Sequence, residues 1–361
     1  MPSTEFWRSQ RVFVTGHTGF KGAWTTRWLS RLGATQHGFA LAPNTTPSLF
    51  SNLDTPGLTS CLGDVRDTEV LAEAVRRAHP TVAIHMAAQP LVRRSYREPA
   101  ETYTTNVIGT LNVLDVLRHY APTLKAVLVI TTDKVYANDN SGRAFFEGDR
   151  LGGHDPYSSS KAACEEVVSC YRQSYFEDLG VPIAAARAGN VIGGGDWSED
   201  RLIPDIWRAL EAGHGVVLRN PDSVRPWQHV LDPVSGYLDY LEAMASDRWI
   251  DLPRALNFAP VPDDPMTVRE VTESLGRAMD ISQPWELAEG SQPVEMKLLT
   301  LDASLAAGSI GWRPQLTGRR AVEWTADWIR ATRAGTPMQD AVDDQIEQYE
   351  TLLAASKENK T

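Results

Sequence analysis

The sequence has few cysteines, and this shortage excludes several kinds of protein. Its 361 residues include only Cys61, Cys164 and Cys170, which show no metal-ligand spacing. Cys164 and Cys170 are expected on different faces of one helix, ~9 Å apart along its axis, so they cannot form a disulfide. The cysteines therefore predict a reduced, cytoplasmic protein with no metal site.

Long apolar runs and clusters of basic residues are also missing. No stretch approaches the ~20 apolar residues of a membrane span, and the N-terminus lacks the charged and apolar regions of a signal peptide. The formal net charge is -11, and Lys and Arg form no run. We therefore expect no membrane partner and no nucleic-acid partner, and we expect individual Arg residues and helix N-termini to bind any phosphate.

Short apolar runs alternate with helical patterns through the first half of the chain, which predicts βαβ units and a parallel sheet. After residue 190 this pattern weakens. The C-terminal stripe of Val342, Ile346, Tyr349 and Leu353 predicts a helix that packs on its own domain. The expected strands are 11–15, 35–41, 58–63, 81–88, 126–132 and 182–187, and the expected helices are 20–32, 68–78, 99–119, 157–179, 201–213 and 267–280.

This order predicts an α/β protein with a Rossmann-type, doubly wound parallel sheet and a smaller, mainly C-terminal lobe for the substrate. We expect a dinucleotide-binding domain over 6–190, with return segments from about 226–258. The substrate lobe would then comprise 191–225 and 259–361. Ligands of such sheets bind in the crevice at the carboxyl ends of the strands.

A glycine-rich turn follows the first expected strand and opens a helix. Gly16, Gly19 and Gly22 have the spacing G-x-x-G-x-x-G, which differs from the general G-x-G-x-x-G fingerprint. Glycines here let the backbone turn tightly and approach a pyrophosphate at the helix N-terminus. The turn therefore predicts a dinucleotide site, whose other expected contacts are His17, Thr18 and Phe20.

One expected part of this site is missing. An acidic residue usually follows the turn by about 20 positions and binds the ribose hydroxyls, yet the second strand ends in Gly38-Phe-Ala-Leu41. No Arg stands there for a 2′-phosphate either, so NAD is favoured over NADP. Asp64, with Val65 beside it, is a candidate for the adenine edge, and its alternative role is to cap the next helix.

Tyr157 and Lys161 are the most informative pair in the sequence. Residues four apart on a helix share one face, about 6 Å apart along the axis. The Lys ammonium can stabilise a tyrosinate and lower a phenol pKa that starts near ~10. Such a phenol takes the proton from a sugar hydroxyl while hydride leaves the carbon. Asp133 and Lys134 add acid and base groups that alcohol oxidation does not need, which favours oxidation followed by elimination.

These residues resemble the extended short-chain dehydrogenase/reductase family and, within it, the CDP-glucose 4,6-dehydratases. The resemblance runs from about Phe6 to the final helix. It is carried by Thr15-Gly-His-Thr-Gly-Phe-Lys-Gly22, His85-Met-Ala-Ala-Gln-Pro90, Thr131-Thr-Asp-Lys134, Asp155-Pro-Tyr-Ser-Ser-Ser-Lys161, Arg187-Ala-Gly-Asn-Val-Ile-Gly-Gly-Gly-Asp-Trp197 and Arg225-Pro-Trp-Gln-His-Val230.

The resemblance implies a role for each matching residue. Tyr157 and Lys161 would be the dehydrogenase pair, Thr132 would hold the 4-hydroxyl, and Asn106 would support the Lys or, alternatively, bend its helix. Asp133 would protonate the leaving C6 hydroxyl, although a helix-capping role is the alternative. Lys134 would remove the C5 proton, or else stabilise the enolate or position the sugar. Ala87, Ala88 and Gln89 would contact the cofactor NAD, and Asn190, Arg201, Arg219 and Arg225 the nucleoside diphosphate.

The implied activity is that of a hydro-lyase, which converts CDP-glucose to CDP-4-keto-6-deoxy-glucose and restores NAD in each turnover. A nucleotide-sugar 4-epimerase, or a 4,6-dehydratase for another nucleotide-hexose, is the alternative, and a non-catalytic dinucleotide-sensing protein is a third interpretation. The resemblance also implies a homodimer or homotetramer, with its contacts on the helices 99–119 and 157–179.

Overall fold

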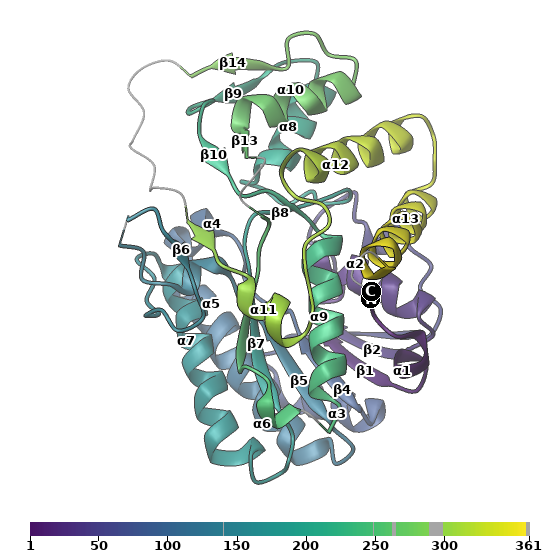
Figure 1. Ribbon diagram of the computed structural model, residues 1–361, viewed down its shortest axis with the longest axis vertical. Coiled ribbons are helices and arrows are strands. Elements are labelled where there is room, and N and C mark those ends of the chain that lie inside the picture. The colour runs from purple at the N-terminus through teal and green to yellow at the C-terminus, as the bar shows by residue number, and fades with distance from the viewer. Residues whose placement is uncertain (140, 248, 262–264, 289–298, 359–361) are drawn as a thin grey trace.

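Seven parallel strands form the central sheet of the chain (Figure 1). The computed structural model describes residues 1–139, 141–247, 249–261, 265–288 and 299–358. The strand order is β12-β7-β5-β4-β1-β2-β3. The strands are β1 (Arg11–Thr15), β2 (Thr35–Ala40), β3 (Leu58–Leu62), β4 (Val82–His85), β5 (Ala126–Ile130), β7 (Ile183–Ala188) and β12 (Ala255–Phe258), and every neighbouring pair is parallel.

The strand order reverses between β1 and β4, which makes the crevice at Thr15 and His85 the expected ligand site of a doubly wound sheet. The fold class predicted from the sequence is therefore confirmed. Five of the six predicted strands begin and end within two residues of the prediction. The sixth, β4, ends at His85 instead of Ala88. Just beyond this end, the Met86 and Ala87 amides donate to the Thr15 hydroxyl.

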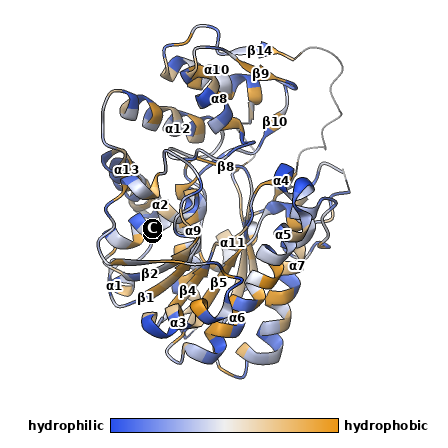
Figure 2. Cartoon of the chain, turned by 180° about the vertical axis from the view of Figure 1, so that it is seen from behind, coloured by the Kyte–Doolittle hydropathy of each residue, from blue (hydrophilic) through white to orange (hydrophobic). Residues whose placement is uncertain are grey.

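Helices cover both faces of the sheet, and the strands alternate their side chains between two cores. Val12 and Val14 of β1 pack in one core with Trp24 and Trp28, while Phe13 faces the other. In Figure 2 the strands are largely hydrophobic between helices whose outer sides are polar. One face carries α2 (Phe20–Arg31), α9 (Leu231–Met244) and α13 (Met338–Glu358), and the other α3 (Thr68–Ala78), α6 (Gly109–Tyr120) and α7 (Pro156–Tyr171).

The predicted C-terminal stripe packs within this chain, but against α2 on the sheet and not on the smaller lobe to which 259–361 was assigned. Val342, Ile346, Tyr349 and Leu353 are buried on α13, and the Tyr349 ring meets Trp28 of α2 edge to face at 5.7 Å. No helix within the described ranges has the length and apolar character that crossing a membrane requires.

A smaller lobe lies beyond the carboxyl ends of the strands, at the top of Figure 1. The chain enters it directly from β7 through β8 (Val191–Ile192), which pairs with β11 (Gln228–His229). Its other elements are α8 (Leu202–Glu211), β9 (Val216–Leu218), β10 (Val224–Arg225), β13 (Met266–Thr267), α10 (Val268–Ala278), β14 (Trp285–Leu287) and α12 (Gly318–Arg333). The lobe thus lies on the side of the sheet where the crevice opens.

Both long helices predicted from the sequence are interrupted. The expected helix 99–119 is α5 (Pro99–Tyr103), a π-helical turn η2 (Thr104–Ile108) and then α6. The expected helix 157–179 is α7 followed by the π-helical turn η4 (Arg172–Phe176). The apolar pattern does not reveal a π turn, because the one extra residue shifts the pattern by less than a third of a turn.

Candidate active site

The loop between β1 and α2 is packed so closely that only glycine fits at two positions. Gly16 has a φ of +76°, and a Cβ there would lie 2.7 Å from the Ala87 nitrogen. A Cβ on Gly22 would lie 2.2 Å from the Gly16 oxygen. Gly19 is the N-cap of α2, and a Cβ there would meet nothing closer than 3.5 Å. The N-terminus of α2 is therefore open to an anion, and the loop fits the pyrophosphate of a dinucleotide.

His17 supports this loop from behind. Its Nε2 lies 2.7 Å from the Ser60 hydroxyl, and a Cβ on Gly38 would lie 2.4 Å from its ring. Burial lowers the pKa of His17 to about 4, so the ring is neutral at pH 7. Thr18 donates its hydroxyl to the Leu41 oxygen at 2.8 Å and so joins the loop to the end of β2. The His17 side chain therefore faces the sheet, while its backbone lies in the loop.

Asp64 and Val65 follow β3, where the adenine edge is expected. Asp64 accepts from Arg66 Nη2 at 2.5 Å, and this hydrogen bond lowers the pKa of the carboxyl group. Asp67, and not Asp64, caps α3 by accepting from the Val70 amide at 3.1 Å. The capping alternative for Asp64 is therefore wrong.

Residues 87–89 follow β4 across the crevice from the loop. Gln89 is buried, and its backbone amide donates to Asn106 Oδ1 at 2.8 Å. Asn106 Nδ2 in turn donates to the Ser160 hydroxyl on α7 at 2.9 Å. Asn106 therefore contacts α7 through Ser160, whereas the Lys161 ammonium donates to the Ile130 oxygen at 2.9 Å.

Tyr157 and Lys161 lie on the first turns of α7, where the resemblance predicts them. Asp155 caps this helix by accepting from the Ser158 amide at 2.9 Å, and the Tyr157 amide donates to the Ser95 hydroxyl at 3.1 Å. Both Tyr157 and Lys161 are buried, with 8% and 6% of their surface exposed. The local cap and the contact with Ser95 thus hold Tyr157 at the end of the sheet.

Asp133 and Lys134 lie in a 3-10 turn, η3 (Asp133–Val135), which follows β5 and has Thr132 as its N-cap. Asp133 Oδ1 accepts from the Thr132 hydroxyl at 2.8 Å and from Lys134 Nζ at 3.2 Å. The Asp133 carboxylate raises the pKa of Lys134. Thr132, and not Asp133, caps the turn, so the capping alternative for Asp133 is wrong. A Cβ on Gly189 would lie 2.1 Å from Asp133 Oδ2, so this glycine leaves the space for the carboxylate.

Lys21 lies near Lys161 and Asp133, although our sequence analysis did not select it. Its ammonium lies 5.8 Å from the centre of the Tyr237 ring. Burial, with the charges of Lys161 and Arg201, lowers the pKa of Lys21 to about 7, while Asp133 opposes this shift. Its signal in the sequence is a cation inside the glycine-rich turn, on the helix end that faces the crevice.

The four expected nucleotide contacts lie between the sheet and the lobe. Asn190, with a φ of +42°, joins β7 to β8. Arg201 precedes α8, and its buried Nε has no hydrogen-bond partner among the described residues. The positive charge of Arg201 is one cause of the lowered pKa of Lys21, so the two side chains lie near each other. Arg219 is exposed after β9, and Arg225 lies on β10.

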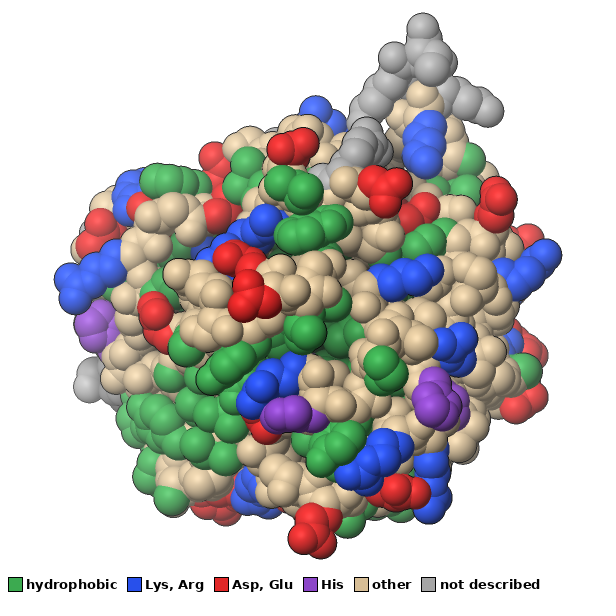
Figure 3. Space-filling view, turned by 90° about the horizontal axis from the view of Figure 1, so that it is seen from below, with side chains coloured by type: hydrophobic (Ala, Val, Ile, Leu, Met, Phe, Trp, Pro, Cys, Tyr) green, Lys and Arg blue, Asp and Glu red, His purple; other side chains and the backbone are tan. Residues whose placement is uncertain are grey.

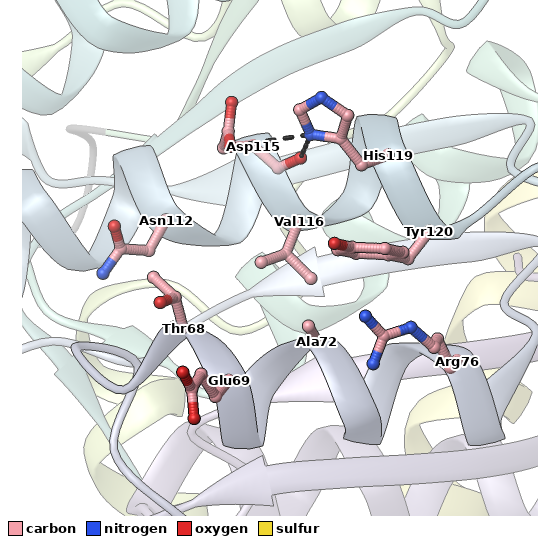
Figure 4. Close-up of a pocket in the computed structure, with 9 residues that line it drawn as sticks. All are labelled: Thr68, Glu69, Ala72, Arg76, Asn112, Asp115, Val116, His119 and Tyr120. Carbon is pink, nitrogen blue, oxygen red and sulfur yellow. Dashed lines mark hydrogen bonds and ion pairs between the residues drawn. The ribbon is translucent and has the colours of Figure 1, made fainter.

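A cleft of about 480 Å³ lies apart from these residues, between α3 and α6 (Figure 4). None of its lining residues is a candidate site residue: Thr68, Glu69, Ala72, Arg76, Asn112, Asp115, Val116, His119 and Tyr120. The Arg76 guanidinium lies over the Tyr120 ring at 4.0 Å, which closes one end of the cleft. On the face that Figure 3 shows, basic side chains lie among acidic ones.

The chain is similar in sequence to known sugar-nucleotide enzymes. Residues 12–251 match the NAD dependent epimerase/dehydratase family. The CDP-glucose 4,6-dehydratase of Salmonella typhimurium (strain LT2) is 43% identical over 340 residues, which are 91% of this chain and 94% of the relative. The dTDP-glucose 4,6-dehydratase of Streptomyces antibioticus is 28% identical over 337 residues, which are 90% and 93% of the two chains.

Solved structures agree with the fold. The UDP-glucose 4-epimerase of Thermus thermophilus, solved as a complex with NAD, has a TM-score of 0.73 and 26% identity over 88% of this chain and 98% of its own. The dTDP-glucose 4,6-dehydratase DesIV of Streptomyces venezuelae has a TM-score of 0.74 over 90% and 98%. The matched region holds the glycine-rich loop, the Tyr157/Lys161 pair and the Thr132–Lys134 turn. The chain therefore belongs to the NAD dependent epimerase/dehydratase family.

Proposed function

We propose that this protein is a sugar-nucleotide 4,6-dehydratase, which converts CDP-glucose to CDP-4-keto-6-deoxy-glucose with loss of water. The observation that carries the proposal is the meeting of two groups at one end of the sheet. One is the Tyr157/Lys161 pair, which oxidation needs, and the other is the Asp133/Lys134 pair, which elimination needs. The relative of 43% identity, whose printed name is CDP-glucose 4,6-dehydratase, favours CDP as the nucleotide.

The cofactor is NAD, which when bound would supply the acceptor for the C4 hydride and the donor of hydride to C6. The loop 16–22 would hold its pyrophosphate, because the backbone there is close-packed and the N-terminus of α2 is open. Asp64 and Val65 would hold the adenine, and residues 87–89 would line the opposite wall. Tyr157 and Lys161 would face the nicotinamide and its ribose.

The first step removes the proton of the C4 hydroxyl. Tyr157, as tyrosinate, takes this proton, and Lys161 holds the charge of the phenolate in place. Thr132 would orient the 4-hydroxyl, since it directly precedes Asp133 in the buried turn. The 4-ketone that results acidifies the C5 proton, which prepares the elimination.

The ion pair between Asp133 and Lys134 solves a problem in the elimination. As the acid, Asp133 must be protonated, and as the base, Lys134 must be neutral. The raised pKa of Lys134 instead favours its charged form. One proton transfer across the 3.2 Å hydrogen bond gives a neutral carboxyl and a neutral amine together. A sugar that excludes water favours this neutral pair, because charges are costly in a dry site. Lys134 then takes the C5 proton, Asp133 protonates the departing C6 hydroxyl, and water leaves. The Lys134 ammonium would return a proton to C5 when C6 receives the hydride.

The test of the function is the product formed by the purified protein. It is incubated with NAD⁺ and with CDP-, dTDP-, UDP- or GDP-linked hexoses, and the products are weighed by mass spectrometry. We expect CDP-glucose to lose one water, with little reaction of the others. A product of unchanged mass and inverted C4 would instead identify a 4-epimerase, and water loss from another nucleotide would correct the nucleobase.

The assembly, domain boundaries and compartment are further parts of the proposal. Exposed apolar side chains on the helices 99–120 and 156–176 support a homodimer or homotetramer; they are Tyr103, Ile108, Tyr120 and Tyr175. We assign 6–190 with 226–258 to the dinucleotide domain, because β12 joins the sheet. Three free cysteines, one of them exposed, support a reducing cytoplasm.

A further inference from the structure

A buried ion pair lies directly behind the candidate catalytic residues. Arg187 on β7 donates to both oxygens of Glu165 on α7, from Nε and from Nη2, at 2.9 Å each. Both side chains are 5% exposed. Two parallel hydrogen bonds fix the relative orientation of the groups as well as their distance. The pair therefore sets how α7 lies on the sheet.

The same ion pair holds both ends of the catalytic segment 132–135. Thr131, just before the segment, donates its hydroxyl to Glu165 Oε1 at 2.6 Å. Tyr136, just after it, accepts from Arg187 Nη1 at 2.8 Å on its hydroxyl oxygen. Glu165 thus binds the residue before the segment, and Arg187 binds the residue after it.

The Tyr136 hydroxyl is held from a second side. It donates to Asn257 Oδ1 on β12 at 2.7 Å, and burial raises the pKa of Tyr136 to about 12. The phenol is therefore neutral and can accept and donate at once. Its ring stacks on Phe145 at 5.2 Å, with the Arg187 guanidinium on it at 5.0 Å. The end of the segment is consequently fixed by contacts in three directions.

Glu165 also belongs to the face of α7 that carries the dehydrogenase pair. It stands four residues after Lys161 and eight after Tyr157, so the three share one side of the helix. Lys161 donates to the Ile130 oxygen, and Glu165 accepts from Thr131, the next residue. Two successive turns of α7 are therefore joined to successive residues at the end of β5.

We propose that Glu165 and Arg187 are positioning residues, which hold the Tyr157/Lys161 pair and the segment 132–135 in one arrangement around the sugar. Neither side chain is among the residues that would touch the substrate. The inference rests on the proposed function, because oxidation and elimination at C4, C5 and C6 of one bound sugar require both groups to be in place together. An error of about 1 Å in such an arrangement costs roughly 100-fold in rate.

The first test uses Tyr136→Phe in the full chain with NAD⁺, which frees only the far end of the segment. In a single turnover of CDP-glucose, we expect NADH to form within about twofold of the wild-type rate, while water loss slows about tenfold or more. NADH then accumulates. Tyr171→Phe is the matched control, since it removes a phenol that donates to Asp115 at 3.3 Å, away from the site. Equal losses in both steps, or no loss in either, would overturn the proposal.

Glu165→Gln loosens α7 as well as the segment, so we expect both steps to slow about tenfold or more per folded molecule. Glu165→Asp, which keeps the charge, should recover part of the rate. If Glu165→Gln lowers only the unfolding temperature and leaves both rates per folded molecule unchanged, the pair is purely structural and the proposal fails.

Hydrogen exchange gives a readout that needs no substrate. In Tyr136→Phe the amides of 132–137 should exchange about tenfold faster than in the wild type, and in Tyr171→Phe they should not. Unchanged exchange would contradict the positioning role. If wild-type protein releases no water from CDP-glucose, the proposed function fails, and the exchange result still decides whether the ion pair fixes the segment.

Discussion

The half of the molecule built on the sheet and the smaller lobe place their functional residues by different means. In the sheet half, Thr15, His85 and Val129 are paired across three neighbouring parallel strands at or next to their ends, so the residues that follow these strands meet at one edge. In the lobe, Arg219 and Arg225 stand next to or on strands of three and two residues. A long regular sheet therefore fixes the positions of the residues at its edge, whereas short strand pairs leave the positions of their neighbours to local contacts.

Among changes in the sheet half, removal of the Tyr157 hydroxyl should lower the activity most. Tyr157→Phe should lower kcat on the order of 10³-fold, because no other group takes the C4 proton. The rate is measured as NADH formed in a single turnover with CDP-glucose. NAD⁺ binding measured by calorimetry serves as the control and should change little. A variant that still oxidises at more than a tenth of the wild-type rate would remove Tyr157 from the first step.

The next comparison sets one glycine of each region against the other. Gly22→Ala should destabilise the protein by about 3 kcal/mol, since a Cβ there would lie 2.2 Å from the Gly16 oxygen. Gly213→Ala, after α8 in the lobe, should cost about 1 kcal/mol, because its φ of +80° is strained for alanine but nothing lies within 4 Å. Urea unfolding measures both. Equal costs would show that the loop is not as closely packed as described.

The arginines of the lobe should differ among themselves. Arg201→Ala should raise the KM for CDP-glucose about 30-fold, since its guanidinium is partly buried near Lys21. Arg219→Ala should raise it only about threefold, because an exposed charge contributes little. Initial rates at varied substrate concentrations give both values. The reverse order would place the diphosphate farther out in the lobe.

Acid should weaken the folded state through buried histidines. Burial lowers the pKa of His85 and of His229 to about 3, so both stay neutral in the folded chain and become protonated below about pH 6.5 in the unfolded chain. Their contribution to stability is complete above pH 6.5 and is lost as the pH falls towards 3, at up to about 1.4 kcal/mol per pH unit for each.

Asp232 acts in the opposite direction. Burial raises its pKa to about 6, so its contribution is present below pH 3.8 and is lost as the pH rises through 6.

Urea unfolding of the wild type and of His85→Gln at pH 7 and pH 5 isolates the contribution of one histidine. The variant should lose less stability on acidification than the wild type, and an identical loss in both would mean that His85 titrates normally.

The sequence predicted more of the sheet half than of the lobe, for a physical reason. Buried parallel strands are continuous apolar runs, and β1 and helix α3 begin and end where the pattern predicts. The apolar pattern did not reveal α9, α12 or β12, although β12 completes the sheet. Short strands and the helices around them depend on contacts distant in sequence, which a local pattern does not contain.

The site followed the same division. The glycine-rich turn and the Tyr157/Lys161 spacing are local, and the structure places both at the crevice. The Glu165–Arg187 ion pair joins residues 22 apart, and the close approach of Gly189 to Asp133 joins segments that follow different strands. Neither has a local signal, although Glu165 stands one turn after Lys161.

The order of the residues alone determined the fold class, the dinucleotide turn and the chemistry of oxidation with elimination, because each depends on spacings of a few residues. Only the tertiary structure decided that Asp133 and Lys134 form an ion pair, that Lys21 is partly buried with a lowered pKa, and that the Glu165–Arg187 pair contacts the residues on both sides of the segment 132–135. Burial and charge neighbourhood set these properties, and both arise from segments that meet only when the chain is folded.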